Sequence, residues 1–129
     1  MAYETYGNFS MDCADSDTMK AYRLVYVDSS GDVDLPAAGT DAEVLAIIGT
    51  TVDAPTEAGD VTVRPIGGGV AKVAVAASQT VADGNDLYLN TAADDGTVIT
   101  GTSGWLVGTC VSPATVTSGA SELAVVSCV

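Results

Sequence analysis

The sequence predicts an all-β fold, and three observations support this prediction. Short runs alternate apolar with polar residues, which is the period-2 pattern of strands with one buried face. Turn-forming residues separate the runs, with 14 glycines and many Asp, Ser and Thr among 129 residues. The runs recur at near-regular spacing, which is typical of small all-β domains. We therefore expect a small β-barrel or β-sandwich.

Residues 1–20 follow neither a strand period nor a helical period. Aromatic and methionine side chains are interspersed there with aspartates. We expect an extended N-terminal arm over residues 1–20, followed by a single β domain over residues 21–129. Aromatic side chains on a segment that cannot pack on itself indicate docking on a partner. A frayed terminus is the alternative.

The first half of the predicted domain contains a hairpin and a central strand. Residues 21–27 have apolar side chains on both faces and form the first strand. Residues 28–32 are a turn, and residues 33–35 form a short return strand. Residues 43–50 are almost continuously apolar, which predicts a central buried strand.

Residues 58–75 contain two alternating valine runs on either side of Gly67, Gly68 and Gly69. Glycine adopts the positive φ values that a tight reversal needs. Because Pro65 has no N–H group, the first run must end or lie at a sheet edge near it. We predict a β-hairpin over residues 58–75.

The second half of the chain repeats this arrangement of strands and turns. Residues 87–90 and 97–100 flank an Asp-Gly dipeptide, which favours a tight hairpin. Residues 105–111 and 122–129 form the last two strands, with a loop over residues 112–121 between them.

The three cysteines, Cys13, Cys110 and Cys128, do not resemble a disulfide framework. If the last two strands form a simple hairpin, Cys110 lies opposite a residue near Leu123 rather than opposite Cys128. We therefore expect free, mostly buried thiols. Because the chain has no histidine and no CxxC pair, we expect no zinc site.

The net charge of −13 excludes several classes of partner. Nucleic acids and anionic membranes are bound through clusters of Lys and Arg, and the four basic residues are dispersed in the sequence. We expect neither partner. The opening residues lack the basic and apolar regions of a secretory signal, and no run reaches the ~20 apolar residues that span a bilayer. Synthesis in the cytoplasm is therefore expected.

The sequence contains no pattern that indicates catalysis or cofactor binding. Histidine is absent and only two lysines are present, so the usual bases that activate a nucleophile are scarce. The acidic residues lie almost wholly at turns, where aspartate bonds the local backbone. Residues 12–17 and 28–34 each gather three carboxylates without the EF-hand spacing, so turn chemistry is the favoured interpretation and calcium the alternative. We expect no enzyme activity, no metal and no cofactor.

Strand and turn patterns follow one another in a distinctive order between residues 24 and 129. They are Leu24-Val-Tyr-Val, Asp28-Ser-Ser-Gly, Val44-Leu-Ala-Ile-Ile-Gly, Ala58-Gly-Asp-Val-Thr-Val, Gly67-Gly-Gly-Val, Val81-Ala-Asp-Gly-Asn-Asp-Leu-Tyr, Asp95-Gly-Thr-Val, Trp105-Leu-Val-Gly-Thr and Leu123-Ala-Val-Val. In this order the chain resembles the bacteriophage capsid decoration (cement) proteins.

The resemblance implies a β-tulip-like domain that forms a homotrimer on the capsid exterior of the virion. Such proteins bridge neighbouring major capsid protein subunits and stabilise the filled head, and an acidic protein suits a position away from DNA. The alternative is a carbohydrate- or host-surface-binding β-module displayed on a virion or cell surface. The residues expected at the capsid interface are Tyr3, Tyr6, Phe9 and Met11 on the arm, with Arg64 and Lys72 as ion-pair partners.

Overall fold

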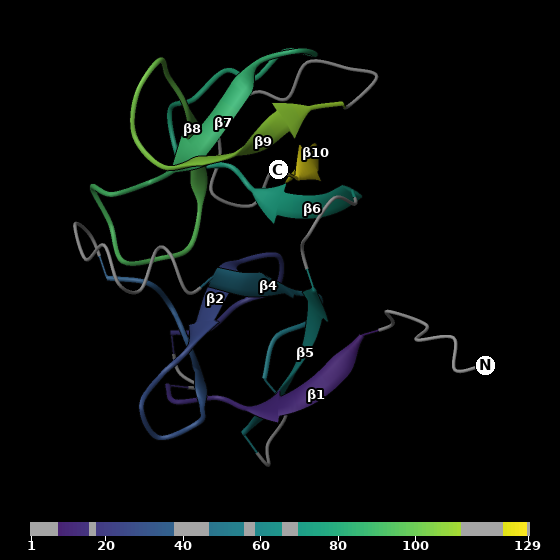
Figure 1. Ribbon diagram of the computed structural model, residues 1–129, viewed down its shortest axis with the longest axis vertical. Helices are drawn as coiled ribbons and strands as arrows, with labels where there is room; N and C mark the ends of the chain where they lie inside the picture. The colour runs from purple at the N-terminus through teal and green to yellow at the C-terminus, as the bar shows by residue number, and fades with distance from the viewer. Residues whose placement is uncertain are drawn as a thin grey trace.

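The computed structural model describes residues 8–15, 18–37, 47–55, 59–65 and 70–111, together with the backbone of residues 123–128. Within these ranges the chain forms ten strands in two five-stranded sheets, and all strand pairs within the sheets are antiparallel. Figure 1 shows the two sheets one above the other, with the first half of the chain in the lower one. The expectation of an all-β fold is confirmed.

The N-terminal sheet contains the first five strands. In spatial order they are β1 (Phe9–Asp12), β5 (Asp60–Pro65), β4 (Ile47–Thr51), β2 (Leu24–Val27) and β3 (Val33–Asp34). The predicted hairpin of β2 and β3 is confirmed, and the central position of β4 confirms the described part of the strand expected over residues 43–50. A parallel bridge between Cys13 and Val33 joins the two ends of the sheet, so the sheet curls on itself.

The C-terminal sheet contains the other five strands. In spatial order they are β6 (Val70–Ala74), β10 (Leu123–Cys128), β9 (Leu106–Cys110), β7 (Asp86–Leu89) and β8 (Val98–Thr100). The hairpin of β7 and β8 is confirmed between the predicted strands, but its connection is longer than the tight turn that the Asp-Gly dipeptide favours. Asn90 N–H donates to the Thr97 carbonyl at 2.9 Å, so the connection spans residues 91–96. A parallel bridge between Val75 and Val98 joins the ends of this sheet as well.

The hairpin predicted over residues 58–75 is wrong. β5 pairs with β1 and β4 in one sheet, whereas β6 pairs with β10 in the other. The connecting residues 66–69 lie outside the described residues. Alternation locates both strands correctly, but it does not specify their partners, and both sides of β5 are already occupied by strands from elsewhere in the chain.

Each sheet encloses its own cluster of buried apolar side chains. The N-terminal cluster contains Met19, Val25, Val33, Val61 and Val63, with Met11, Cys13, Leu35 and Ile48 packed against it. The C-terminal cluster contains Leu24, Ala71, Val73, Val75, Val81, Leu87, Leu89, Val98, Val107 and Cys110, with Ile47 and Trp105 packed against it. Leu24 and Ile47 belong to strands of the N-terminal sheet and pack in the C-terminal cluster, so the two sheets share an apolar contact.

Tyr22 connects the backbones of the two sheets. Its N–H donates to the Thr51 carbonyl at 2.7 Å, and its carbonyl accepts the Ala74 N–H at 2.8 Å. Its φ of 61° lies in the left-handed region, which a non-glycine residue occupies only when surrounding contacts enforce it. Tyr22 is therefore fixed by one hydrogen bond to each sheet.

The next residue strengthens the same junction. The Arg23 side chain is buried, donates from Nη1 to the Asp95 carbonyl at 3.2 Å, and lies 3.8 Å from the Asp95 carboxylate. Beside it, Leu24 N–H donates to the Gly96 carbonyl at 2.9 Å. The loop between β7 and β8 thus holds the start of β2, and Arg23 is used inside the protein.

Part of the segment expected to form an arm is paired within the chain. Phe9 lies opposite Val63 and Met11 opposite Val61, so β1 extends the N-terminal sheet. Met19 is 3% exposed in the N-terminal cluster. The extended conformation expected for the arm is present over Phe9–Asp12, but this strand lies on the protein's own sheet.

The expected free thiols are found at both described cysteine side chains, Cys13 and Cys110, and Cys110 is buried. Cys110 lies opposite Val126, not opposite a residue near Leu123. The pairing of β9 with β10 is therefore offset from the simple hairpin expected from the sequence.

Candidate functional site: a cleft between the two sheets

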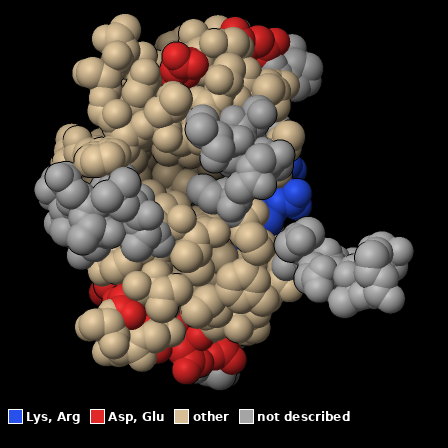
Figure 2. Space-filling view, in the orientation of Figure 1, with Lys and Arg blue, Asp and Glu red and all other residues tan. Residues whose placement is uncertain are grey.

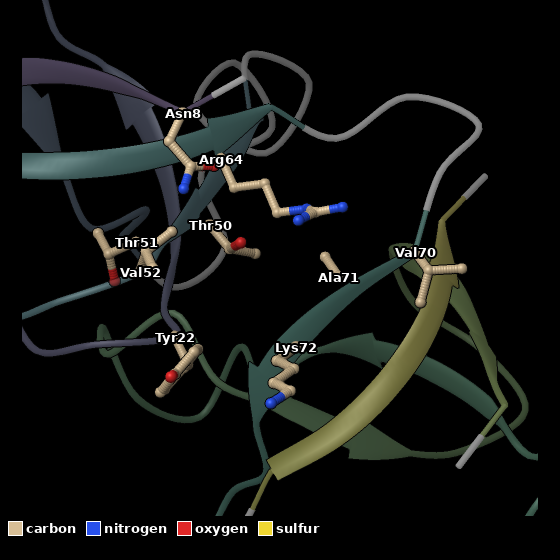
Figure 3. A pocket seen from close by; sticks show the side chains of 9 residues that line it. All are labelled: Asn8, Tyr22, Thr50, Thr51, Val52, Arg64, Val70, Ala71 and Lys72. Atoms are coloured by element: carbon tan, nitrogen blue, oxygen red, sulfur yellow. The ribbon is translucent and has the colours of Figure 1, made fainter. Parts of the chain in front are cut away.

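A cleft of about 400 Å³ opens between the N-terminal and C-terminal sheets. Figure 3 shows that its walls come from β4 and β5 on one side and from β6 on the other. The residues that line it are Asn8, Tyr22, Thr50, Thr51, Val52, Arg64, Val70, Ala71 and Lys72. We refer to this feature as the inter-sheet cleft.

The pairing register places Arg64 in the wall formed by the N-terminal sheet. Arg64 lies opposite Thr50 on β4, and Thr50 lies opposite Leu24 on β2, so these side chains share the face turned toward the C-terminal sheet. Val63 points to the other face and is fully buried in the N-terminal cluster. Alternation along β5 therefore sends Val63 into the core and Arg64 into the cleft.

Alternation along β6 forms the opposite wall. Ala71 and Val73 are buried in the C-terminal cluster, whereas Val70 and Lys72 are exposed, Val70 to 46%. Val70 and Lys72 therefore share one face of β6. The cleft combines one cationic side chain from each sheet with an exposed apolar side chain beside Lys72 (Figure 3).

The charge of the cleft is opposite to that of the whole protein. The chain has four basic and 17 acidic residues. Two of the basic residues, Arg64 and Lys72, line this cleft, and no acidic residue among those that the structure describes lines it. In Figure 2 the visible basic surface lies at the waist between the sheets, and the visible acidic surfaces lie toward the two ends. The inter-sheet cleft is thus a local cationic site on an acidic protein.

The structure brings together only some of the residues predicted to bind the capsid. Arg64 and Lys72 both line the cleft, and Phe9 is 38% exposed on β1. Met11 is partly buried against the N-terminal cluster, which leaves less of it for a partner. Tyr3 and Tyr6 lie outside the described residues, so their docking stays a prediction.

The cleft also contains residues that the sequence analysis did not select, notably Asn8, Tyr22 and Val70. Val70 carried a usable signal, because it stands two residues before Lys72 and must share its face of a strand. Asn8 and Tyr22 carried none, because their positions depend on pairing between distant segments.

The acidic turns use their carboxylates in local hydrogen bonds. The Asp28 carboxylate accepts the backbone N–H groups of Ser30 at 2.8 Å and Asp32 at 3.0 Å. The Asp34 carboxylate accepts the Leu35 N–H at 2.8 Å. Among the residues that the structure describes, no group of three or more His, Cys, Asp or Glu side chains is placed to hold a metal ion.

Two carboxylates face each other across β1 and β5. Asp12 lies directly opposite Asp60 in the strand register. A hydrogen bond that protonated Asp60 donates to the Asp12 carboxylate, together with desolvation and the Asp12 charge, raises the pKa of Asp60 above its ordinary value. The pair therefore makes the attachment of β1 sensitive to acidity.

The Cys13 thiol is partly buried against the N-terminal cluster and is poorly suited to nucleophilic chemistry. Burial raises the pKa of Cys13, and the charges of the nearby Asp34, Asp15 and Asp32 carboxylates raise it further. A hydrogen bond from the Asp15 backbone lowers the pKa, but by less than these effects raise it. A raised pKa keeps the sulfur in its protonated, weakly nucleophilic form at neutral pH.

No helix in the described part of the chain is suited to crossing a bilayer. Comparison of the chain with protein-family models, with curated proteins and with solved structures finds no match.

Proposed function

We propose that this protein is a virion structural protein that binds the outer surface of a phage capsid. In this role it bridges neighbouring major capsid protein subunits as a homotrimer and acts without catalysis, cofactor, nucleic acid or membrane. The resemblance of its strand and turn order to capsid decoration proteins motivates the proposal. The two-sheet structure supplies the physical support for it.

The observation that carries the proposal is that both sheets expose apolar side chains. Phe9, 38% exposed, lies on the N-terminal sheet, while Val70, 46% exposed, and Leu106, 48% exposed, lie on the C-terminal sheet. A bridging protein needs separate contact regions, because each capsid subunit must be held at a different place. Modest contacts then add through multivalency, since the second contact is intramolecular once the first is made.

The acidic exterior supports the same role. A net charge of −13 opposes association with packaged DNA, and it keeps a protein soluble before assembly. Arg64 and Lys72 provide a local exception at the inter-sheet cleft, where the acidic side chains of a partner can be held.

The alternative function, carbohydrate or host-surface binding, requires aromatic side chains exposed together on one face. Trp105 packs against the C-terminal cluster, and Tyr88 is buried. These two aromatic residues therefore do not support the alternative.

The direct test uses heads of the phage that encodes the protein, produced without its gene. Purified protein is added to these heads, the mixture is sedimented, and release of the packaged DNA is followed during heating. We expect the protein to sediment with the heads to a saturating level and to raise the temperature of DNA release. Protein that stays in the supernatant at micromolar concentration contradicts the proposal.

A further inference from the structure

We infer that the inter-sheet cleft is a docking site for an extended, acidic peptide segment of the capsid partner. The segment adds as a strand beside Val70–Lys72 of β6 and places its acidic side chains near Arg64 and Lys72. The assignment of the segment to the capsid rests on the proposed function, whereas the peptide preference of the cleft rests on its own geometry.

The first support is the direction of the backbone groups of β6. Ala74 N–H donates away from β10 to the Tyr22 carbonyl at 2.8 Å, and Ala76 N–H donates to the Val98 carbonyl at 2.9 Å. Successive residues of a strand direct their backbone groups to opposite sides. The N–H and C=O groups of Val70 and Lys72 therefore also point away from β10, toward the cleft.

This part of β6 is an open edge in the described structure. β10 is the only strand paired with Val70–Lys72 among the described residues, because the backbone hydrogen bonds and the bridge that join β6 and the residues after it to Tyr22 and β8 begin at Ala74. Such an edge is a template for an added strand, whose main chain supplies affinity and whose alternate side chains supply specificity.

The second support is charge. Within the described ranges neither Arg64 nor Lys72 forms an ion pair, whereas the buried Arg23 is paired with Asp95. Two cations on facing walls attract a carboxylate and repel a basic peptide. Hydrogen bonds between such ionised groups are stronger than those between neutral groups.

The third support is the shape of the cleft. Its volume of about 400 Å³ lies within the range of pockets that hold ligands. The exposed Val70 side chain offers an apolar contact beside Lys72 on the same face of β6. A segment with an acidic residue two positions away from a β-branched residue would match both features, because residues i and i+2 of an extended segment lie on the same face.

The test measures fluorescence anisotropy of a labelled octapeptide, Val-Val-Glu-Glu-Val-Val-Glu-Glu, titrated with the full-length protein. Each face of this extended peptide carries both valine and glutamate. We expect binding of this peptide and none of the matching valine–lysine peptide. Arg64→Gln and Lys72→Gln should each weaken binding about five-fold, the size expected for one exposed charge pair. Lys20→Gln is the matched control, because it removes one exposed positive charge outside the cleft and should leave binding unchanged.

Strand addition is tested separately from charge. The valine–glutamate peptide is methylated on alternate backbone nitrogens, in two versions that block opposite edges of the strand. One version should lose binding at least ten-fold, because it removes the N–H groups that face β6, and the other should retain it. Equal binding of both versions, binding of the valine–lysine peptide, or unchanged binding by Arg64→Gln and Lys72→Gln would each overturn the inference. Circular dichroism checks that these variants stay folded.

Sedimentation with phage heads separates the two proposals. If the protein sediments with heads but does not bind the peptide, the inference about the cleft fails and the proposed function stands. If the peptide binds but the protein does not attach to heads, the proposed function fails and the segment must belong to another partner. If both hold, Arg64→Gln and Lys72→Gln should lower occupancy on heads and Lys20→Gln should not.

Discussion

The two sheets fill their interiors in different ways. The C-terminal cluster is built from β6 to β9 and the neighbouring loops, with Leu24 and Ile47 added from the other sheet. The N-terminal cluster depends on the beginning of the chain, which supplies the buried Met19 and the partly buried Met11 and Cys13. Residues from the range 8–20 therefore contribute to a core, and this part of the expected arm is built into the domain.

This difference changes how attachment through the arm must be tested. Deletion of residues 1–20 would remove β1 and Met19 along with any docking side chains, so folding and attachment would change together. Deletion of residues 1–7 leaves β1 and the N-terminal cluster in place. It removes Tyr3 and Tyr6 alone among the predicted interface residues.

The largest expected effect comes from the side chain that both sheets share. Leu24→Ala should lower the free energy of unfolding by about 4 kcal/mol, because it leaves a cavity in the C-terminal cluster at a fully buried position. Urea unfolding followed by Trp105 fluorescence and by circular dichroism measures the change. Coincident unfolding curves from the two signals indicate that the two sheets unfold together. A decrease of less than 1 kcal/mol in the free energy of unfolding contradicts the shared apolar contact.

A smaller effect is expected where the β7–β8 loop packs on β2. Gly96 has a φ of +67°, and a Cβ added there would lie 2.5 Å from the Leu24 carbonyl oxygen. Gly96→Ala should therefore lower the free energy of unfolding by about 3 kcal/mol. Gly84→Ala is the matched control, because Gly84 has a φ of +82° and no atom within 4 Å of an added Cβ. We expect the control to cost about 1 kcal/mol, from backbone strain alone. Thermal unfolding measures both values. If Gly96→Ala and Gly84→Ala lower stability equally, the close approach of Gly96 to Leu24 does not add to the cost of the Gly96 substitution.

Replacing Met11 and Met19 with alanine tests how much residues 8–20 contribute to the stability of the protein. Met19→Ala should cost about 2 kcal/mol because Met19 is 3% exposed, and Met11→Ala should cost about 1 kcal/mol because Met11 is only partly buried. Chemical denaturation gives both values. If neither substitution changes stability, the N-terminal cluster does not depend on residues 8–20 and the contrast between the sheets is lost.

The smallest effect concerns acidity at the β1–β5 pair. Because the pKa of Asp60 is raised in the folded protein, protonation of Asp60 favours the folded state. This stabilisation grows as pH falls through the folded-state pKa. It is absent at neutral pH. Asp12→Asn should return the pKa of Asp60 toward 3.8 and increase hydrogen-exchange protection of β1 at neutral pH. NMR titration of the Asp60 carboxyl carbon measures the shift. An unchanged titration midpoint would exclude Asp12 as the cause.

Much of the fold follows from local sequence. Alternation of valines located β5 and β6, and the Asp28 turn located the β2–β3 hairpin, because these signals lie within one segment. The partner of β6 was not predictable, since β10 lies at the other end of the chain and three glycines allow any path between the sheets. Met19 was missed for a similar reason, because its burial depends on contacts with distant strands.

The candidate site was predictable only in part. Charge singled out Arg64 and Lys72, and alternation placed both on exposed faces of strands. Their placement around one cleft depends on the crossing from one sheet to the other after Pro65, which neither charge nor periodicity encodes. A hairpin would have placed the two residues on one continuous sheet; in the structure they line opposite walls of a cleft.

The central claim is that the protein braces the outside of a capsid. A difference map between electron cryomicroscopy reconstructions of gene-deleted heads, imaged with and without added protein, tests it most directly. We expect discrete added density on the outer surface at junctions between capsid subunits. A map without added density at saturating protein, or density confined within one subunit, would contradict it.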